Sequence, residues 1–254
     1  MGFTAAGYKV AAACEEEEWR MKHLEEVCLV CGKPLKYITE DEQMECVFCH
    51  RTFHSKAQCE DGHYICDECH AEQGIKTIRE YCMSTKSKNP IEMMMEMMEN
   101  PYIHMHGPEH HVMTGAALIT AYYHAGGQIE LEKALDEMEK RGRQVPGGVC
   151  GFWGSCGAGI SAGMFMSIVT QATPLGKEEW GLSNRMTAKA LEAIGEVGGP
   201  RCCKRNTFLA ALEAVKFTEE KLGIKMGVPK QVRCTFIKYN PQCIGKRCPF
   251  VKKL

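Results

Sequence analysis

The sequence predicts an α+β protein in which a small Cys/His-rich zinc module precedes a mostly α-helical domain. Two observations predict this fold class. Four closely spaced Cys/His pairs lie between residues 28 and 69, and after residue 90 apolar residues recur mainly at helical spacing, with few strand signals. We therefore expect four segments: an N-terminal helical segment at 1–27, the Cys/His zinc-binding module at 28–82, a linker at 83–90, and the helical domain at 91–254.

The composition narrows the function classes. The chain of 254 residues has 16 cysteines and 10 histidines, and its net charge is only −1. A near-neutral charge disfavours nucleic-acid binding, and the most apolar segment, residues 160–169, is too short to span a membrane. The first ten residues lack the basic and apolar regions of a secretory signal. We therefore expect a cytoplasmic protein whose cysteines bind metal or do thiol chemistry rather than form disulfides.

The first two elements are a short helix and the zinc module. The stretch "EEEEWRMKHLEEV" is typical of an amphipathic helix. In the module, each C-x2-C turn places two thiolates on one side of a knuckle, and two pairs complete a tetrahedral zinc site. Eight ligands therefore predict two zinc ions, whereas a cluster of buried free cysteines would not need such regular spacing. The pairs are Cys28/Cys31, Cys46/Cys49, Cys59/His63 and Cys66/Cys69.

Two pairings of these ligands are open. Sequential pairing joins the first pair with the second, and crossed pairing joins the first with the third and the second with the fourth. We favour the crossed pairing because Cys66 and Cys69 stand where a helix at 66–82 should start, and a helix N-terminus favours thiolates. Knuckle, hairpin and helix start resemble a treble clef. The stretch "CEDGHYICDEC" resembles a cross-brace finger such as RING, without its last C-x2-C pair. A site this small supplies folding energy, so we expect a structural or partner-docking role.

Further helices are predicted by caps and apolar spacing. Pro90 and Pro108 each stand where a helix begins, and "MMMEMM" reads as a core stripe rather than a metal or ligand box. Residues 131–138 carry apolar side chains at helical spacing. A helix at 156–170 has Ala and Gly repeats four residues apart, so one of its faces should pack closely. Ser183 and Asn206 are the expected N-caps of the last two helices.

The cysteines of the helical domain stand on turns rich in glycine or proline. None forms a C-x2-C pair, so no further zinc knuckle is expected. Several precede predicted helices, and the cations Arg201, Lys204 and Arg205 flank two of them. Helix N-termini and cations lower the pKa of a thiol, so we expect ligating or reactive thiolates. These cysteines are Cys150, Cys156, Cys202, Cys203, Cys234, Cys243 and Cys248, the last followed by proline as in some ferredoxin-type sites.

A second candidate site is the stretch "HMHGPEHH". It holds His104, His106, His110 and His111 with Glu109 among them. Imidazole and carboxylate groups can bind a metal or move protons. We expect acid–base roles for His106, Glu109 and His110, and a ligand role for His111. The alternative is a polar helix start with exposed histidines.

The chain resembles a known but uncharacterised family. The run "CLVCGKPL", "GHYICDECH", "HMHGPEHH", "VPGGVCGFWGSCGA", "EEWGLSNRMT", "GGPRCCKR" and "CIGKRCPF" looks like a domain-of-unknown-function family of anaerobic microbes. That resemblance implies no established activity. Locally, "CGAGISAGMFM" is similar to the GCA-x-x-G segment of small redox-active helical proteins. This likeness implies thiol or iron–sulfur redox chemistry, with Cys156 matched and Cys202 or Cys203 downstream, although the downstream spacing differs.

These observations lead to one main functional hypothesis and two alternatives. We expect a metal- and thiol-dependent oxidoreductase or sulfur transferase acting on a small-molecule or sulfur-donor substrate. Its catalytic cysteines would be Cys150, Cys156, Cys202 and Cys203. The ligands of an iron–sulfur cluster or another metal would include Cys234, Cys243, Cys248 and His111. Arg201 would stabilise negative charge. The first alternative is a zinc adaptor that docks a protein without catalysis. The second is a metal hydrolase built on the histidine cluster, although no H-E-x-x-H helix is present.

Overall fold

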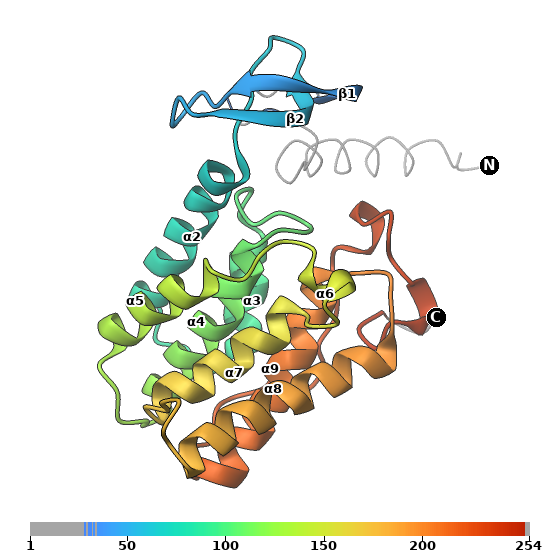
Figure 1. The fold of residues 1–254 in the computed structure, drawn as a ribbon. Helices are drawn as coiled ribbons and strands as arrows, with labels where there is room; N and C mark the ends of the chain where they lie inside the picture. Colours follow the sequence, from blue (N-terminus) through green and yellow to red (C-terminus); the bar gives the residue numbers. More distant parts are fainter. Residues whose placement is uncertain (1–27, 29, 32, 34, 252–254) are drawn as a thin grey trace, which may run out of the picture.

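The described part of the protein is mostly helical and carries one small antiparallel sheet (Figure 1), which confirms the mostly helical fold with a small sheet expected from the sequence. The computed structural model describes residues 28, 30–31, 33 and 35–251. The helix expected within residues 1–27 lies outside the described residues. The elements are β1 (Leu35–Glu45), β2 (Thr52–Cys59), α2 (Asp67–Ser84), α3 (Pro90–Met98), α4 (Glu109–His124), α5 (Leu131–Gly142), α6 (Val149–Phe152), α7 (Gly157–Val169), α8 (Glu178–Val197) and α9 (Cys203–Leu222), with 3-10 turns η1 (Ile237–Tyr239) and η2 (Gly245–Arg247).

Strands β1 and β2 form a hairpin that stands apart from the helical body (Figure 1). Its register pairs Leu35 with Cys59 and Glu45 with Thr52, with an irregularity between Tyr37 and Glu42. Few of the hairpin side chains whose burial the structure describes are both buried and apolar. Before Ala71, these are Met44 and four cysteines. The side chains so described therefore provide little apolar packing to hold the hairpin in shape.

Helix α2 connects the hairpin to the helical body. Its N-cap is Cys66, whose sulfur accepts a hydrogen bond from the backbone N–H of Cys69. Further along, Ile75, Ile78 and Cys82 are buried among the helices. Helix α2 therefore starts at the hairpin and ends in the core. It packs within the helical body, although the sequence placed it in the module expected at 28–82.

The helical body is arranged around α4 and α7. Helix α4 packs against α2, α3, α5, α7 and α9, and α7 packs against α4, α5, α8 and α9 (Figure 1). The apolar core includes the methionine run of α3, in which Met93, Met94, Met97 and Met98 are at most 1% exposed. This confirms the core interpretation of "MMMEMM". None of the helices in the described part of the chain is both long enough and apolar enough to cross a membrane.

Two helix starts differ from the sequence expectation. Helix α8 begins at Glu178, so Ser183 lies inside it and donates its hydroxyl hydrogen bond to the Trp180 carbonyl instead of capping. Two acidic residues in the first turn suit the positive end of the helix. Helix α9 begins at Cys203 and its N-cap is Cys202, so Asn206 is also inside its helix.

The glycines of α7 allow α8 to approach closely, as the small-residue repeat predicts. A Cβ atom placed on Gly163 would lie 1.8 Å from Thr187 Oγ1 and 3.2 Å from the Ser183 carbonyl oxygen. A Cβ atom on Gly159 would lie 2.7 Å from a methyl carbon of Leu191. The contact therefore depends on the absence of side chains at these two positions.

We expect the substitution Gly163→Ala to lower the free energy of unfolding by about 1–3 kcal/mol, because the added methyl group overpacks the α7–α8 contact. The matched control is Gly181→Ala on α8, where an added Cβ meets no atom within 4 Å. That change should be neutral or stabilising by up to about 1 kcal/mol, since alanine favours helix over glycine. Urea unfolding followed by far-ultraviolet circular dichroism measures both. Equal effects of the two substitutions would contradict the packing argument.

Candidate functional site

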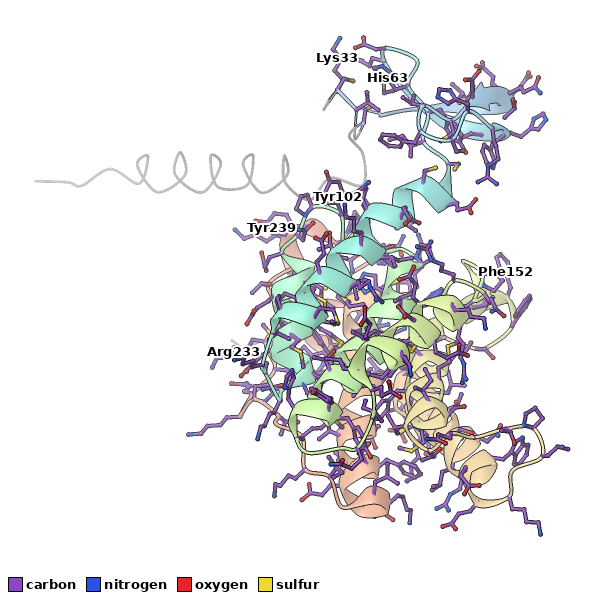
Figure 2. The ribbon with its side chains drawn as sticks, turned by 90° about the vertical axis from the view of Figure 1, so that its left-hand side faces the viewer. Lys33, His63, Tyr102, Phe152, Arg233 and Tyr239 are labelled. Carbon is purple, nitrogen blue, oxygen red and sulfur yellow. The ribbon has the colours of Figure 1, made fainter. Side chains whose placement is uncertain are left out.

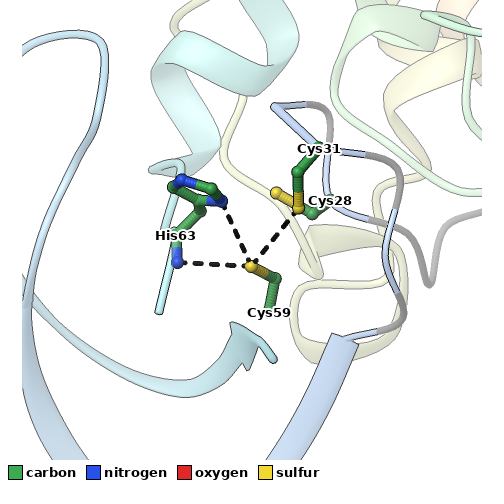
Figure 3. A group of neighbouring side chains, drawn as sticks. All are labelled: Cys28, Cys31, Cys59 and His63. Atoms are coloured by element: carbon green, nitrogen blue, oxygen red, sulfur yellow. Dashed lines mark hydrogen bonds between the residues drawn. The ribbon is translucent and has the colours of Figure 1, made fainter. Parts of the chain in front are cut away.

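The first candidate metal site joins the first and third ligand pairs. Cys28, Cys31, Cys59 and His63 each offer a ligand atom, and these atoms all lie within 4.8 Å of one another (Figure 3). Cys59 Sγ is 3.8 Å from Cys31 Sγ and 3.3 Å from His63 Nδ1. A tetrahedral zinc ion with bonds of 2.3 Å to sulfur separates its sulfurs by about 3.8 Å. We call these four residues the first tetrad.

The second tetrad joins the second and fourth pairs. Cys46, Cys49, Cys66 and Cys69 also have ligand atoms within 4.8 Å of one another. Cys49 Sγ and Cys66 Sγ are 3.8 Å apart. The structure therefore has the crossed pairing and not the sequential one. Either tetrad could hold a metal ion, and the second tetrad would fasten the hairpin to the start of α2.

Backbone N–H groups surround the sulfurs of the tetrads. Burial raises the pKa of Cys46, but hydrogen bonds from the N–H groups of Cys66, Cys49 and Phe48 outweigh it and lower that pKa to about 6. Burial likewise raises the pKa of Cys59, but hydrogen bonds from the N–H groups of His63 and Asp61 outweigh it and lower that pKa to about 7. These N–H···S hydrogen bonds stabilise thiolate, the form of cysteine that binds metal.

A different group of thiols meets in the helical domain. Cys202 at the start of α9 and Cys234, Cys243 and Cys248 from the C-terminal segment line one enclosed pocket. Aromatic and aliphatic side chains form most of the remaining wall: Met105, Phe208, Phe236, Ile237, Ile244, Phe250 and Val251. We call this the four-thiol pocket. It brings together positions 202 and 248, which lie 46 residues apart in the sequence.

N–H donors also point at the sulfurs of the four-thiol pocket. The N–H of Arg205 lies 3.4 Å from Cys202 Sγ, and the Nδ2 group of Asn240 lies 3.5 Å from the same sulfur. The N–H of Gly245 donates to Cys243 Sγ at 3.4 Å. Hydrogen bonds of this kind to cysteine sulfurs are a common feature of iron–sulfur sites, where they tune the reduction potential.

The four thiols are spaced more widely than those of the tetrads. Among the residues that the structure describes, the two tetrads are the only groups of His, Cys, Asp or Glu whose ligand atoms all lie within 4.8 Å of one another. Burial and the nearby thiols raise the pKa of Cys202 and raise that of Cys234 to about 11. Cys202 and Cys234 therefore hold their protons at neutral pH, because an apolar pocket with other sulfurs nearby disfavours the thiolate.

The structure does not gather all the expected cysteines into one site. Cys202 and Cys203 occupy consecutive positions, the N-cap and first residue of α9, so their side chains leave the helix in different directions. Burial raises the pKa of Cys203 to about 12, against the expected lowering by the helix and its cations. Desolvation of this partly buried sulfur outweighs those charges.

Cys150 and Cys156 line a separate and larger opening, which we call the thiol cleft. It lies between α6, α8 and the start of α9, and its cavity volume is about 460 Å³, against about 20 Å³ in the four-thiol pocket. Arg205 and Cys202 connect the two: Arg205 lines both cavities and its N–H reaches Cys202. The expected single thiol site is therefore two adjacent sites.

The histidine cluster is a buried network rather than an exposed helix start. His104, Glu109 and His110 are at most 3% exposed, and Lys204 is 1% exposed. Glu109 Oε1 accepts the backbone N–H of His104 at 2.9 Å and lies 3.4 Å from His104 Nδ1. Lys204 Nζ donates to the His104 carbonyl at 3.1 Å. We call these four residues the buried histidine network.

Neighbouring groups shift the pKa values of the carboxylate and the imidazoles inside this network. Burial alone would raise the pKa of Glu109, but a hydrogen bond from His104 and the nearby imidazoles lower it to about 2. Burial and the charge of Lys204 lower the pKa of His110 to about 3, so this ring is neutral at pH 7. The acid–base roles of Glu109 and His110 stay predictions, since solvent does not reach them in this conformation.

The other two histidines lie at the edge of the network. His106 places Nε2 3.3 Å from Asn240 Oδ1, and burial together with Arg201 lowers its pKa to about 4. His111 Nδ1 lies 3.1 Å from the Val145 carbonyl. None of the histidines in this stretch belongs to a group with metal-site spacing among the described residues. The metal-hydrolase alternative stays a prediction.

The comparisons with known proteins identify the family. Residues 78–251 match a family described as a family of unknown function (DUF5714). The chain belongs to this family. The match begins inside α2 and covers the four-thiol pocket, the thiol cleft and the buried histidine network, but not the two tetrads. The expected likeness to an uncharacterised family is thus confirmed. No curated protein and no solved structure matches the chain.

Two asparagines contribute to the thiol sites and were not predicted as site residues. Asn206 Nδ2 donates to Cys156 Sγ at 3.3 Å, and Asn240 places its amide against Cys202. Both are buried. Asn240 stands three residues before Cys243, and Asn206 three residues after Cys203, so their only sequence signal is proximity to the cysteines.

Proposed function

We propose that this protein is a metal- and thiol-dependent redox protein whose helical domain binds an iron–sulfur cluster through Cys202, Cys234, Cys243 and Cys248. The proposal depends on one observation: these four thiols, from two separate segments of the chain, line the same enclosed apolar pocket. Four cysteine thiolates are the usual ligand set of such clusters.

Three properties of the four-thiol pocket favour a cluster over a single ion. Its sulfurs are spaced more widely than those of a tetrahedral ion site. A cluster contains several metal atoms and therefore keeps its ligands further apart. The N–H donors at Cys202 and Cys243 suit bound sulfur ligands. The aromatic wall limits solvent access, which is one of the protein's means of setting a reduction potential.

The two tetrads complete the proposal as structural zinc sites. Three or four thiolates at tetrahedral spacing, with no open position, are typical of structural rather than catalytic zinc. The large number of free thiols fits a reducing compartment such as the cytoplasm. A bound cluster would supply one-electron chemistry, while the protein supplies the ligands, the apolar wall and a substrate site next to it.

The experiment is metal and sulfide analysis of protein purified without oxygen. We expect iron and acid-labile sulfide together with about two zinc ions per chain. Cys234→Ser and Cys243→Ser should each remove most of the iron and sulfide and leave the zinc in place. The matched control is Cys82→Ser, because Cys82 is a buried cysteine outside the pocket.

Two results would overturn the proposal. One is wild-type protein with full zinc and no iron or sulfide. The other is iron and sulfide content that survives all the pocket substitutions. The adaptor alternative makes the opposite prediction: a partner protein would be captured through the tetrads, and Cys243→Ser would change neither metal content nor capture.

A further inference from the structure

The thiol cleft has features that the proposed cluster does not need. Its lining includes two half-buried thiols, Cys150 and Cys156, and two guanidinium groups, Arg201 and Arg205. Among the residues that the structure describes, none in the lining carries a carboxylate. The apolar side is formed by Leu191 and Ile194 of α8. The cleft therefore offers sulfur chemistry, positive charge and an apolar wall in one place.

Glycines keep this cleft open without a packing reason. A Cβ atom on any of five lining glycines would meet no atom within 4 Å. Gly154 and Gly198 have positive φ, which accounts for glycine there. Gly195, inside α8, has neither a positive φ nor a close neighbour, although glycine costs about 1 kcal/mol relative to alanine in a helix. The five are Gly151, Gly154, Gly195, Gly198 and Gly199. Bare backbone around an open space is what a ligand site requires.

The two thiols are placed by one short turn. The carbonyl of Val149 accepts hydrogen bonds from the N–H groups of Trp153 at 2.9 Å and Ser155 at 3.3 Å, so the chain from 149 to 155 folds back on itself. Cys150 and Cys156 each follow one end of this closed turn, and both face the cleft. Cys156 is also the N-cap of α7, and its sulfur accepts the amide hydrogen bond of Asn206. That bond holds the Cys156 sulfur at the edge of the cleft.

The positive charge is partly fixed in place. Arg205 donates to the carbonyls of Gly198 and Pro200, each at 2.8 Å, which holds the loop that forms one wall. Arg201 is exposed at the rim and makes one hydrogen bond of 3.4 Å to Gln242. Its guanidinium can therefore turn towards an incoming anion. On the far side of the turn, Phe152 projects into solvent (Figure 2) and is 89% exposed.

We propose that the thiol cleft binds a small anionic disulfide and reduces it. Cys156, having lost its proton to solvent, attacks one sulfur of R–S–S–R, forming a Cys156–S–S–R bond and releasing RS⁻. Cys150, also deprotonated, then attacks Cys156 Sγ, forming a Cys150–Cys156 disulfide and releasing the second RS⁻. The ligand gains two electrons and the two protein thiols lose them. Arg201 orients the anionic groups of R, and Asn206 positions the Cys156 sulfur.

Reduction of the Cys150–Cys156 disulfide back to two thiols rests on the proposed function, because it uses the cluster site. Reopening the Cys150–Cys156 disulfide to two thiolates takes two electrons, which an external one-electron donor would supply in two successive transfers through the proposed cluster, next to Cys202 and the Arg205 that lines both cavities. The exchange steps themselves need no cluster. Failure of the cluster proposal and failure of the cleft proposal can therefore be told apart by experiment.

The test compares two reagent disulfides on zinc-loaded, reduced protein. One is the dianion 5,5′-dithiobis(2-nitrobenzoate), and the other is neutral 4,4′-dithiodipyridine. We expect a fast phase that releases two thiol equivalents per chain, with a Cys150–Cys156 disulfide found by peptide mass spectrometry. Cys156→Ser should abolish the fast phase. Cys150→Ser should leave one equivalent and a mixed disulfide on Cys156.

Charge and shape variants separate recognition from mere exposure. Arg201→Gln should slow the anionic reagent about fivefold, the effect of one partly exposed charge, and leave the neutral reagent unchanged. Arg233→Gln, which removes an exposed arginine outside the cleft, should change neither rate. Gly195→Met should slow both reagents by filling the cleft while leaving the fold as stable or more stable.

Cys243→Ser provides the final comparison. The fast phase should persist in this variant even if its iron is lost, because the exchange steps use only the cleft. The inference is overturned if the fast thiols map outside Cys150 and Cys156, if Arg201→Gln slows both reagents equally, or if Gly195→Met changes neither rate.

Discussion

Removing the metal from the two tetrads should unfold the hairpin while the helical body stays folded. Among the side chains before Ala71 whose burial the structure describes, Met44 is the one buried apolar side chain that is not a candidate ligand, so these side chains provide little packing to hold β1 against β2. Structural zinc contributes about 10–16 kcal/mol of apparent binding energy in small zinc-dependent folds. Loss of that energy far exceeds what a lone two-stranded hairpin can supply.

Hydrogen exchange measured by mass spectrometry, with and without a strong chelator, checks this prediction. Amides of β2 should lose their protection when metal is removed, while those of α4 and α7 keep theirs. The substitution Cys66→Ala should act like the chelator on the second tetrad, because it also removes the N-cap of α2. Cys82→Ala, a buried cysteine outside the tetrads, should leave hairpin protection unchanged. Protection of β2 that persists in fully metal-free protein would contradict the argument.

The tetrads were predictable because their information is local. Each pair lies within five residues of sequence, and ligand identity follows from residue type and spacing. Even the crossed pairing could be favoured in advance, since Cys66 and Cys69 stand at a helix start. The helices around the core were predictable because their apolar repeats lie within single elements, although the caps expected at Ser183 and Asn206 were wrong.

The thiol sites of the helical domain were only partly predictable. Which sulfurs meet depends on how the C-terminal segment folds back on α9, and this long-range contact leaves no spacing signal. The expectation of one site failed where two adjacent residues, Cys202 and Cys203, take different directions from the end of α9. That helix begins three residues earlier than its expected cap, Asn206, and a shift of this size changes which way each cysteine points.

The histidine stretch shows how tertiary burial overrides a polar composition. Five polar residues at a predicted helix start indicated an exposed or catalytic cluster. Instead, α9 brings Lys204 across the stretch, and its Nζ lies 4.4 Å from the centre of the Phe236 ring. The buried cation of Lys204 and the buried carboxylate of Glu109 both act on the His110 ring, and hydrogen bonds from His104 help keep Glu109 charged inside the core. The sequence contained both charges, 95 positions apart, without any sign that they would share one site.

Lys204 and Glu109 should therefore stabilise the fold as a unit. Both charges act on the ring of His110, in opposite directions. The substitution Lys204→Met leaves the Glu109 carboxylate charged in the core with its nearby cation removed, so we expect the free energy of unfolding to fall by about 3–5 kcal/mol. The matched control is Lys216→Met, which removes an exposed lysine of the same helix and should change stability by less than about 0.5 kcal/mol.

The double variant Lys204→Met with Glu109→Gln tests whether the two charges are coupled. Glu109→Gln neutralises the carboxylate that Lys204→Met leaves charged in the core. The double variant should therefore lose less free energy of unfolding than the sum of the two single losses, by about 1–3 kcal/mol. Urea unfolding of zinc-loaded protein, followed by tryptophan fluorescence, gives all four values. Strictly additive losses would mean that Lys204 acts through the Ile103 and His104 carbonyls alone. In that case hydrogen bonds from His104, and not Lys204, would keep the buried Glu109 carboxylate ionised.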